Sequence, residues 1–377
     1  MRKLNLVIAD SDENYINSLE NYLMVHYSKR FDVYTFTTSE YLTAFLDSNE
    51  KRTDILLYCP HIFSVPVSLQ KTVVSIAFVD NILSGTLDNS TSVYKFQHTE
   101  KLISDILRIY SNNGGDNIIF SGQKNTLTAA VFSSAGGAGK SSIAVGCSVM
   151  CARRGMKVFY LNLENVPSTT LYFKGNAEEN FSNIIYYLKD RKHNLSMMLE
   201  GARSVDPDSK VNYFLPPDNI LDMQELEPDE LERLIRQIQT SAQYDAVFID
   251  MAGGLSLLNS VVLKICDAII QVCQPGEISS CKNISMASGL DILERKYSID
   301  LTGKIVTVLN KFKTGYYCRD EENISSVFQV IINECEGFEH LTYAAQLMDI
   351  SEFSAGINRL LEKVIPQWNK NKRKDLC

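Results

Sequence analysis

The stretch Val131–Ala144, VFSSAGGAGKSSIA, constrains the fold more strongly than any other part of this 377-residue chain. A β-rich run, Thr128–Ser133, leads into a series of small residues, and a helix is expected to begin near Lys140. A strand, a loop of small residues and a helix in this order can hold an anion at the amino end of the helix. We therefore expect an α/β domain in this part of the chain.

The segment from Leu4 to Ile109 alternates short β-rich runs with amphipathic ones. Strands are expected at Leu4–Ala9, Phe31–Phe36, Asp54–Tyr58, Val73–Phe78 and Val93–Phe96. The spacing of apolar residues predicts helices over Tyr15–Val25, Tyr41–Leu46 and Leu102–Ile109. Five such units predict a small doubly wound parallel sheet.

A loop-forming sequence, SNNGGDN at 111–117, follows this segment. We expect a first domain at 1–112, a linker at 113–126 and a second domain at 127–377. Further elements are expected in the second domain, with strands at Lys157–Leu161, Ala246–Ile249, Ala268–Val272 and Ile305–Leu309 and a helix from Pro228 to about Ala242. The predicted fold class is α/β, with two doubly wound domains.

Composition limits the classes of partner and the compartment. A formal net charge of −8 gives no global attraction toward nucleic acid, so no DNA partner is expected. No apolar run approaches the roughly 18 residues of a membrane span, and the basic tail at 370–374 is interpreted as a solvated end, so no direct membrane insertion is expected. Nine cysteines without metal-ligand spacing predict buried free thiols, among them Cys147 and Cys151, in a cytoplasmic protein.

The loop at 136–139 has the composition that phosphate binding requires. Backbone N–H groups and the positive end of the helix dipole hold the anion, and larger side chains would block its approach. Lys140 can reach the β- and γ-phosphates of a nucleotide, and the Ser141 hydroxyl can ligate Mg²⁺. The alternative is a structural turn that is merely rich in Gly, Ala and Ser.

A second feature favours nucleotide binding over a structural turn. The apolar sequence YDAVFID, at 244–250, ends in Asp250, which can organise the Mg²⁺ shell through water. Gly253 and Gly254 follow closely, as expected of a mobile sensor loop. The metal-binding prediction is therefore Ser141 with Asp250.

The loop resembles that of the MinD/ParA family of deviant P-loop ATPases, K-G-G-x-G-K-[ST]. Ala135–Ser141, AGGAGKS, matches every position except the first lysine, and the resemblance runs from about Thr128 to Ile365. It implies a P-loop NTPase sheet, ATP and Mg²⁺ as ligands, and a homodimer in the ATP-bound state.

The resemblance assigns roles to further residues. The acid of the first switch falls on Glu164, in Asn162-Leu163-Glu164, and the sensor acid falls on Asp250, so Lys140, Glu164 and Asp250 form the implied catalytic set. The base-recognition asparagine falls on Asn310, in VLNKF, and QPGE at 274–277 resembles the family's P-x-E-type loop. The implied nucleotide contacts are Gly136, Gly137, Ala138, Gly139, Lys140, Ser141, Ser142, Pro275, Asn310 and Lys311.

Two departures from the family pattern predict slow hydrolysis. The missing lysine reaches across the dimer in the family, and Ala135 cannot do this. A cation that acts in this way increases the rate of hydrolysis by a factor on the order of 10³–10⁵, by analogy with the arginine finger. Glu164 places its carboxylate one methylene farther out than the family's Asp, which can misplace the attacking water. Binding should survive both changes.

The first domain resembles a response-regulator receiver, which has a flavodoxin-like sheet. Asp10 and Asp12 follow the first strand, as the receiver's acidic pair does, and Lys95 falls at the receiver lysine. The phosphoacceptor position is Cys59, and a thiol does not receive a phosphoryl group as a carboxylate does. We interpret these residues mainly as loop solvation and a remnant ion pair, which leaves dimerisation or partner docking as the domain's role.

A degenerate receiver joined to a MinD/ParA-like domain with a variant loop resembles the TadZ/CpaE family. That family consists of localisation factors for Tad-type (type IVb) pilus assembly. The resemblance implies an ATP-dependent dimer that settles at a cell site, often the pole or membrane periphery, and recruits pilus or secretion machinery proteins.

Alternatives stay open at this point. One is a fully cycling positioning ATPase of the MinD type, in which another cation replaces the missing lysine. A DNA-partitioning ATPase of the ParA type is weakened by the acidic composition. Aromatic residues over Leu171–Leu188, including Tyr172 and Phe173, are interpreted as core packing or as a nucleotide-sensitive partner face.

Overall fold

The computed structural model describes residues 3–28, 30–48, 52–60, 63, 72–80, 92–112, 126–190, 195–241, 243–313, 327–336 and 343–374. The chain forms two compact units. One contains Met1–Ser121 together with Asp190–Ala202, and the other contains Gly122–Lys189 together with Arg203–Cys377.

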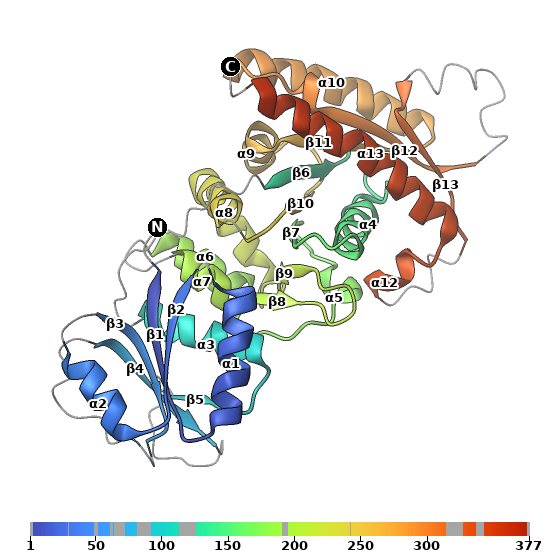
Figure 1. The fold of residues 1–377 in the computed structure, drawn as a ribbon. Helices are drawn as coiled ribbons and strands as arrows, with labels where there is room; N and C mark the ends of the chain where they lie inside the picture. Colours follow the sequence, from blue (N-terminus) through green and yellow to red (C-terminus); the bar gives the residue numbers. More distant parts are fainter. Residues whose placement is uncertain are drawn as a thin grey trace. The chain divides into compact units, whose positions relative to one another are not determined.

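The first unit is built on a five-stranded parallel sheet (Figure 1). Its strands are β1 (Leu4–Ala9), β2 (Phe31–Phe36), β3 (Thr53–Tyr58), β4 (Thr72–Val79) and β5 (Ser92–Tyr94), in the order β2-β1-β3-β4-β5. Its described helices are α1 (Glu13–His26), α2 (Ser39–Asp47), α3 (Thr99–Asn112) and α7 (Leu195–Gly201). This strand order is that of the flavodoxin-like fold.

The two faces of this sheet have separate cores. Apolar residues of α1 and α3 pack on one face, against alternate residues of β1 such as Leu6 and Ile8. Leu42 of α2 packs on the other face, against Val7 and Ala9. Side chains of successive strand residues point to opposite faces, so β1 supplies both cores and is buried over nearly its whole length.

Helix α7 joins the first unit although the neighbouring sequence on both sides belongs to the second. It packs on α3, and Met197 is buried in the same core as the residues of α1 and α3. Arg30 forms a buried ion pair with Glu200 of α7. The contiguous domain at 127–377 proposed from the sequence did not anticipate this helix, because nothing local in the sequence marks its packing partner.

The second unit is built on an eight-stranded sheet in the order β13-β12-β11-β6-β10-β7-β9-β8 (Figure 1). The strands are β6 (Leu127–Phe132), β7 (Val158–Leu163), β8 (Arg203–Val205), β9 (Asn212–Phe214), β10 (Ala246–Met251), β11 (Ala268–Cys273), β12 (Ile305–Phe312) and β13 (Val330–Asn333). All neighbours pair in parallel except β8 and β9, which pair antiparallel.

The helices of this unit connect the strands. They are α4 (Lys140–Arg153), α5 (Thr169–Tyr172), α6 (Phe181–Lys189), α8 (Pro228–Thr240), α9 (Leu257–Ile265), α10 (Glu277–Tyr297), α12 (Ala344–Leu347) and α13 (Ser351–Lys374), with short 3₁₀ helices at Ile220–Glu225 and Thr302–Lys304. Helices α4 and α13 share one apolar core with alternate residues of the central strands, among them Val131 and Phe248. Within the described residues, no helix combines the length and hydropathy that crossing a bilayer requires.

The α/β fold class with two doubly wound domains is confirmed. The aromatic residues at 171–188 do not share one environment. Phe173 and Phe181 are buried, as core packing requires, whereas Tyr186 is exposed, as a partner face requires. Cys147 and Cys151 are both free and buried in α4. Burial raises the pKa of the Cys151 thiol to about 12, so this thiol is unreactive at neutral pH.

Candidate nucleotide-binding site

The phosphate loop lies between the end of β6 and the start of α4, at the carboxyl edge of the sheet. Gly137 and Gly139 have φ values of +71° and +91°, a region that glycine adopts without strain. A Cβ at Gly139 would also collide with the amide nitrogen of Asn310. The backbone path thus requires glycine at 137 and 139, and at 139 the closeness of the loop after β12 requires it as well.

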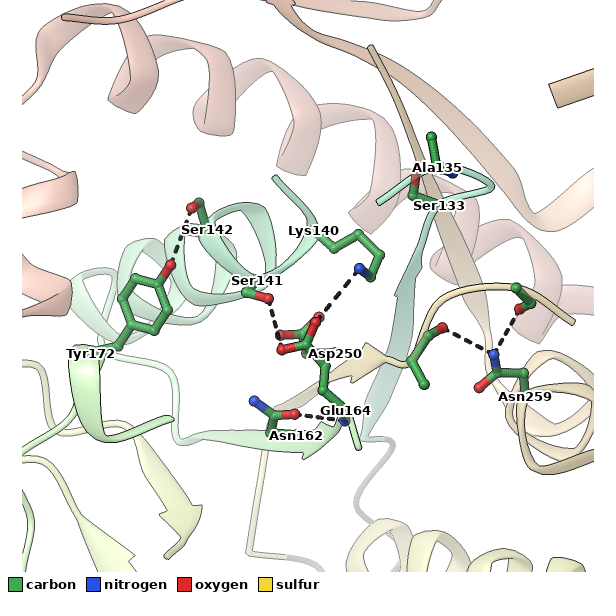
Figure 2. A network of polar contacts seen from close by, with 12 residues as sticks. Ser133, Ala135, Lys140, Ser141, Ser142, Asn162, Glu164, Tyr172, Asp250 and Asn259 are labelled. Carbon is green, nitrogen blue, oxygen red and sulfur yellow. Dashed lines mark hydrogen bonds and ion pairs between the residues drawn. The ribbon is translucent and has the colours of Figure 1, made fainter. Parts of the chain in front are cut away.

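Lys140 and Ser141, at the first turn of α4, both contact Glu164 (Figure 2). The Lys140 ammonium lies 3.6 Å from Glu164 Oε1, and the Ser141 hydroxyl donates to Glu164 Oε2 at 3.2 Å. Glu164 directly follows β7, and its backbone N–H donates to the Asn162 side chain at 2.8 Å. The structure therefore brings the predicted phosphate, metal and switch residues into one cluster.

Asp250 lies on β10, beside this cluster, and is fully buried. Tyr160 on β7 donates its hydroxyl to Asp250 Oδ2 at 2.8 Å, whereas Oδ1 is buried without a hydrogen-bond donor in place. Burial and the nearby charge of Glu164 raise the pKa of the Asp250 carboxyl to about 7, and Ser141, Tyr160 and Lys140 oppose this rise. The sequence did not single out Tyr160, although it lies two residues before Asn162 on the same strand.

The residues of this cluster fit a magnesium ion. The Ser141 hydroxyl and the incompletely bonded Asp250 carboxylate are hard oxygen donors. The described residues contain no group of three or more His, Cys, Asp and Glu side chains that could hold a metal alone. Mg²⁺ is usually bound by one or two protein oxygens together with water and phosphate oxygens, which matches this sparse donor set.

The loop after β10 is held by Asn259 of α9, a residue that sequence reasoning missed. Its side-chain amide donates to the carbonyls of Ala252 and Gly254 at 3.0 and 2.7 Å. Gly254 has a φ of +82°, and Ser256 caps the amino end of α9. The predicted sensor loop is therefore a defined turn anchored to a helix.

Side chains from two other loops contact the phosphate loop. Asn310 Nδ2 donates to the Ala138 carbonyl at 2.8 Å, and Lys311 Nζ donates to the Gly137 carbonyl at 2.8 Å. Gln274, next to Pro275 and directly after β11, lies 3.5 Å from the Gly136 carbonyl. These contacts bring Gln274, Asn310 and Lys311 to the phosphate loop. The nucleotide contacts expected of Pro275, Asn310 and Lys311, including recognition of a base by Asn310, stay predictions.

Two further motif residues occupy defined environments. Ala135 is nearly buried, and its N–H donates to the Ser133 hydroxyl at 3.2 Å. The hydroxyls of Ser142 and Tyr172 lie 3.3 Å apart, which links α4 to the short helix α5 (Figure 2). Tyr172 is thus bonded to the motif rather than projecting as a free partner contact.

Two of the receiver-like residues of the first unit, Asp10 and Lys95, form a buried ion pair. The Lys95 ammonium lies 2.7 Å from Asp10 Oδ2, and both side chains are buried. Asp12 accepts from the N–H of Tyr15 and caps α1. Cys59 directly follows β3 and is buried. The Lys95 ammonium also lies 4.6 Å from the centre of the Tyr15 ring, a cation–π contact that covers the ion pair on one side.

Comparisons with known proteins agree with this division of the chain. Residues 1–111 match the family model for the TadZ-like receiver domain, and residues 126–296 match the model for the AAA domain. No curated protein sequence matches the chain significantly.

Solved structures resemble the second unit in fold. The septum site-determining protein MinD of Pyrococcus horikoshii, complexed with Mg-ADP, is 20% identical with a TM-score of 0.50, covering 63% of this chain and 96% of that one. A chain of the MinC:MinD cell division protein complex of Aquifex aeolicus is 15% identical with a TM-score of 0.51, covering 64% of this chain and 96% of that one. The chain therefore combines a first domain that matches the TadZ-like receiver model with an AAA domain whose fold resembles that of MinD.

Proposed function

We propose that this protein is an ATP- and Mg²⁺-binding localisation and recruitment factor for Tad-type (type IVb) pilus assembly or secretion. It acts as a cytoplasmic homodimer in the ATP-bound state, hydrolyses ATP slowly, and binds pilus or secretion machinery proteins at the cell pole or membrane periphery. One observation carries the proposal: a TadZ-like receiver domain is joined to a phosphate loop that keeps Lys140 and Ser141 but has Ala135 at the signature lysine.

The site supports nucleotide binding through residues of this chain. Lys140 would bind the terminal phosphates, and Ser141 with Asp250 would hold Mg²⁺, which neutralises phosphate charge when bound. Glu164 already contacts both Lys140 and Ser141, so the Glu164 carboxylate would compete with phosphate for Lys140 and with Mg²⁺ for Ser141. The Mg-ADP complex of the P. horikoshii MinD, whose fold the second unit shares, is consistent with this assignment.

The lining of the loop supports slow hydrolysis. Ala135 ends in a methyl group, which can neither reach a partner's phosphate nor stabilise the charge that develops during phosphoryl transfer. A missing cation of this kind costs on the order of 10³–10⁵ in rate. Binding and turnover are therefore separable in this protein, and bound ATP serves to hold a conformation.

The first unit supports a docking role. Lys95 is committed to Asp10, and Cys59 offers a thiol at the position where receivers carry the phosphoacceptor. Phosphoryl chemistry therefore has no acceptor carboxylate at that position. The first unit would therefore act through its surface, by binding a partner.

The test measures assembly and turnover on the same samples. Sedimentation with and without Mg-ATP is combined with phosphate release for the wild type, Lys140→Ala and Ala135→Lys. We expect dimers only with ATP and an intact Lys140, and appreciable phosphate release only from Ala135→Lys. A wild type that ignores ATP altogether would contradict the proposal.

The same experiment decides the second candidate function. A fully cycling positioning ATPase would release phosphate briskly as the wild type, and Ala135→Lys would add little. Such a result would mean that another cation replaces the signature lysine, and the role of a static scaffold would be withdrawn.

A further inference from the structure

We propose that Lys311 is a positioning residue that fixes the phosphate loop in its anion-binding conformation, with Asn310 and Gln274 in supporting roles. The three side chains satisfy three consecutive loop carbonyls, those of Gly137, Ala138 and Gly136 respectively. The inference rests on the proposed nucleotide binding and assigns these residues a function in the loop itself.

Planar peptide geometry connects the carbonyls to the anion site. In a trans peptide the C=O and the following N–H point in opposite directions. Holding the carbonyls of Gly136, Gly137 and Ala138 toward one side turns the N–H groups of the next three residues to the other side. Among the described residues, the N–H groups of Gly137 and Gly139 donate to no acceptor. These donors are available to a phosphate, as the cradle requires.

The end of β12 is distorted at the residues that make these contacts. The pairing register between β12 and β13 shifts between Leu309 and Phe312, which brackets Asn310 and Lys311. Lys311 has a φ of +57°, in the left-handed region that non-glycine residues seldom occupy. Bulges bend a strand and re-aim its side chains, and strained backbone of this kind concentrates at functional sites.

Lys311 contributes more than a single hydrogen bond. Its ammonium carries three donors, of which one is directed to the Gly137 carbonyl, and the side chain is exposed. Asn310 is buried and donates to Ala138 beside Gly139, so it packs the loop from within. Lys311 and Asn310 therefore fix successive peptides of the phosphate loop. The Lys311 ammonium also places a positive charge at the exposed side of that loop.

The test uses hydrogen exchange of the free protein and equilibrium binding of a fluorescent ATP analogue with Mg²⁺. The variants are Lys311→Met, Lys311→Arg and the control Lys313→Met, whose lysine leaves the same strand end and pairs with Glu334. We expect Lys311→Met to speed amide exchange in the peptide that covers the loop and to weaken binding about tenfold. Lys311→Arg should keep loop exchange and affinity near their wild-type values, because arginine can donate to the same carbonyl. Lys313→Met should change neither the exchange nor the affinity.

The outcomes separate this inference from the proposed function. Unchanged loop exchange and affinity in Lys311→Met, while Lys140→Ala abolishes binding, would overturn the positioning role alone. Absence of binding in the wild type would instead overturn the proposed function, and the exchange measurement, which uses no nucleotide, would still decide the role of Lys311. Weakened binding in Lys313→Met as well would show a general effect of surface charge and also overturn the inference.

Discussion

The two units place a lysine and acidic residues at the carboxyl ends of parallel strands, yet one site is closed and the other is open. In the first unit, Lys95 and Asp10 lie 2.7 Å apart and are both buried. In the second, the Lys140 ammonium lies 3.6 Å from Glu164, and the buried Asp250 keeps an oxygen without a hydrogen-bond donor. Strand ends of this kind are the usual ligand sites of open α/β sheets, and in the second site the lysine lies farther from its carboxylate, which is itself partly exposed.

The surroundings of the two lysines explain the difference. Lys95 is covered by the ring of Tyr15, whose hydroxyl donates to the Lys95 carbonyl at 2.9 Å. Lys140 instead follows a loop of small residues in which a bulky side chain would block an anion. The comparison teaches that the same fold yields a structural ion pair or a ligand site according to which side chains fill the space above the strand ends.

Removing each lysine should therefore have opposite consequences. Lys95→Met leaves the Asp10 carboxylate buried without its cation, and we expect it to destabilise the first unit by about 3–5 kcal/mol. Lys140→Met should abolish nucleotide binding but destabilise its unit less than Lys95→Met does, because Glu164 is partly exposed whereas Asp10 is buried. Hydrogen exchange read separately on peptides of the two units, at neutral pH, measures both effects.

A matched double variant tests the cause. Asp10→Asn combined with Lys95→Met removes the buried charge as well as its partner and should recover most of the lost stability. If the double variant is as unstable as Lys95→Met alone, the loss comes from packing of the lysine stem, and the two lysines differ less than the geometry indicates.

Titration of Asp250 should make the free energy of unfolding depend on pH. The pKa of Asp250 is about 7 in the folded protein, above its ordinary value of 3.8, so the native state holds this proton more tightly than the unfolded state does. Its contribution to stability is complete below about pH 4 and is lost as the pH rises through 7. Asp250→Asn should thus stabilise the nucleotide-free protein by roughly 2–4 kcal/mol at pH 8 and have little effect near pH 4.

Urea unfolding without Mg²⁺ or nucleotide, at several pH values between 4 and 8, measures this difference. Glu164→Gln serves as a comparison, because it removes the charge that contributes to the raised pKa while leaving Asp250 in place. A gain from Asp250→Asn that is constant with pH would contradict the buried, titrating carboxyl.

The ion pair between Arg30 and Glu200 should fix α7 on the first unit. Arg30→Met leaves Glu200 buried without this partner, and we expect a loss of roughly 2–3 kcal/mol in the first unit, with faster exchange in α7. The double variant Arg30→Met, Glu200→Met removes both charges and should regain part of that stability. Equal losses in the single and double variants would mean that apolar contacts, such as those of Met197, hold α7 instead.

The repetitive parts of both folds were predictable from sequence, whereas the long-range parts were not. Strands β1 and β2 have the bounds that the sequence predicts, because short runs rich in β-branched, aromatic and other apolar residues mark strands locally. The three-residue strands β8 and β9 are too short to carry such a pattern. The attachment of α7 depends on contacts between residues far apart in the chain, such as Arg30 and Glu200, and no local pattern records them.

The candidate site divides in the same way. The loop and its acids were found from motif spacing, because phosphate binding requires small residues, a lysine and a hydroxyl in fixed order. The supporting contacts of Tyr160 and Asn259 depend on which strands and helices lie side by side. The left-handed backbone of Lys311 has no sequence signal either, since lysine is not a residue expected there.

The smallest expected effect concerns the bond that orients Asp250. The Tyr160 hydroxyl donates to the carboxylate and so favours its charged form, which opposes the rise in pKa. Tyr160→Phe should raise the pKa further and cost about 1 kcal/mol at pH 8, with a smaller cost at pH 5, where the carboxyl is already protonated in the wild type. Urea unfolding at these two pH values measures the difference, and Tyr213→Phe, in a neighbouring strand, controls for loss of a buried hydroxyl. A Tyr160→Phe cost that does not depend on pH would show that the ring packs the sheet without acting on Asp250, and the open site would then lack the support that distinguishes it from the closed one.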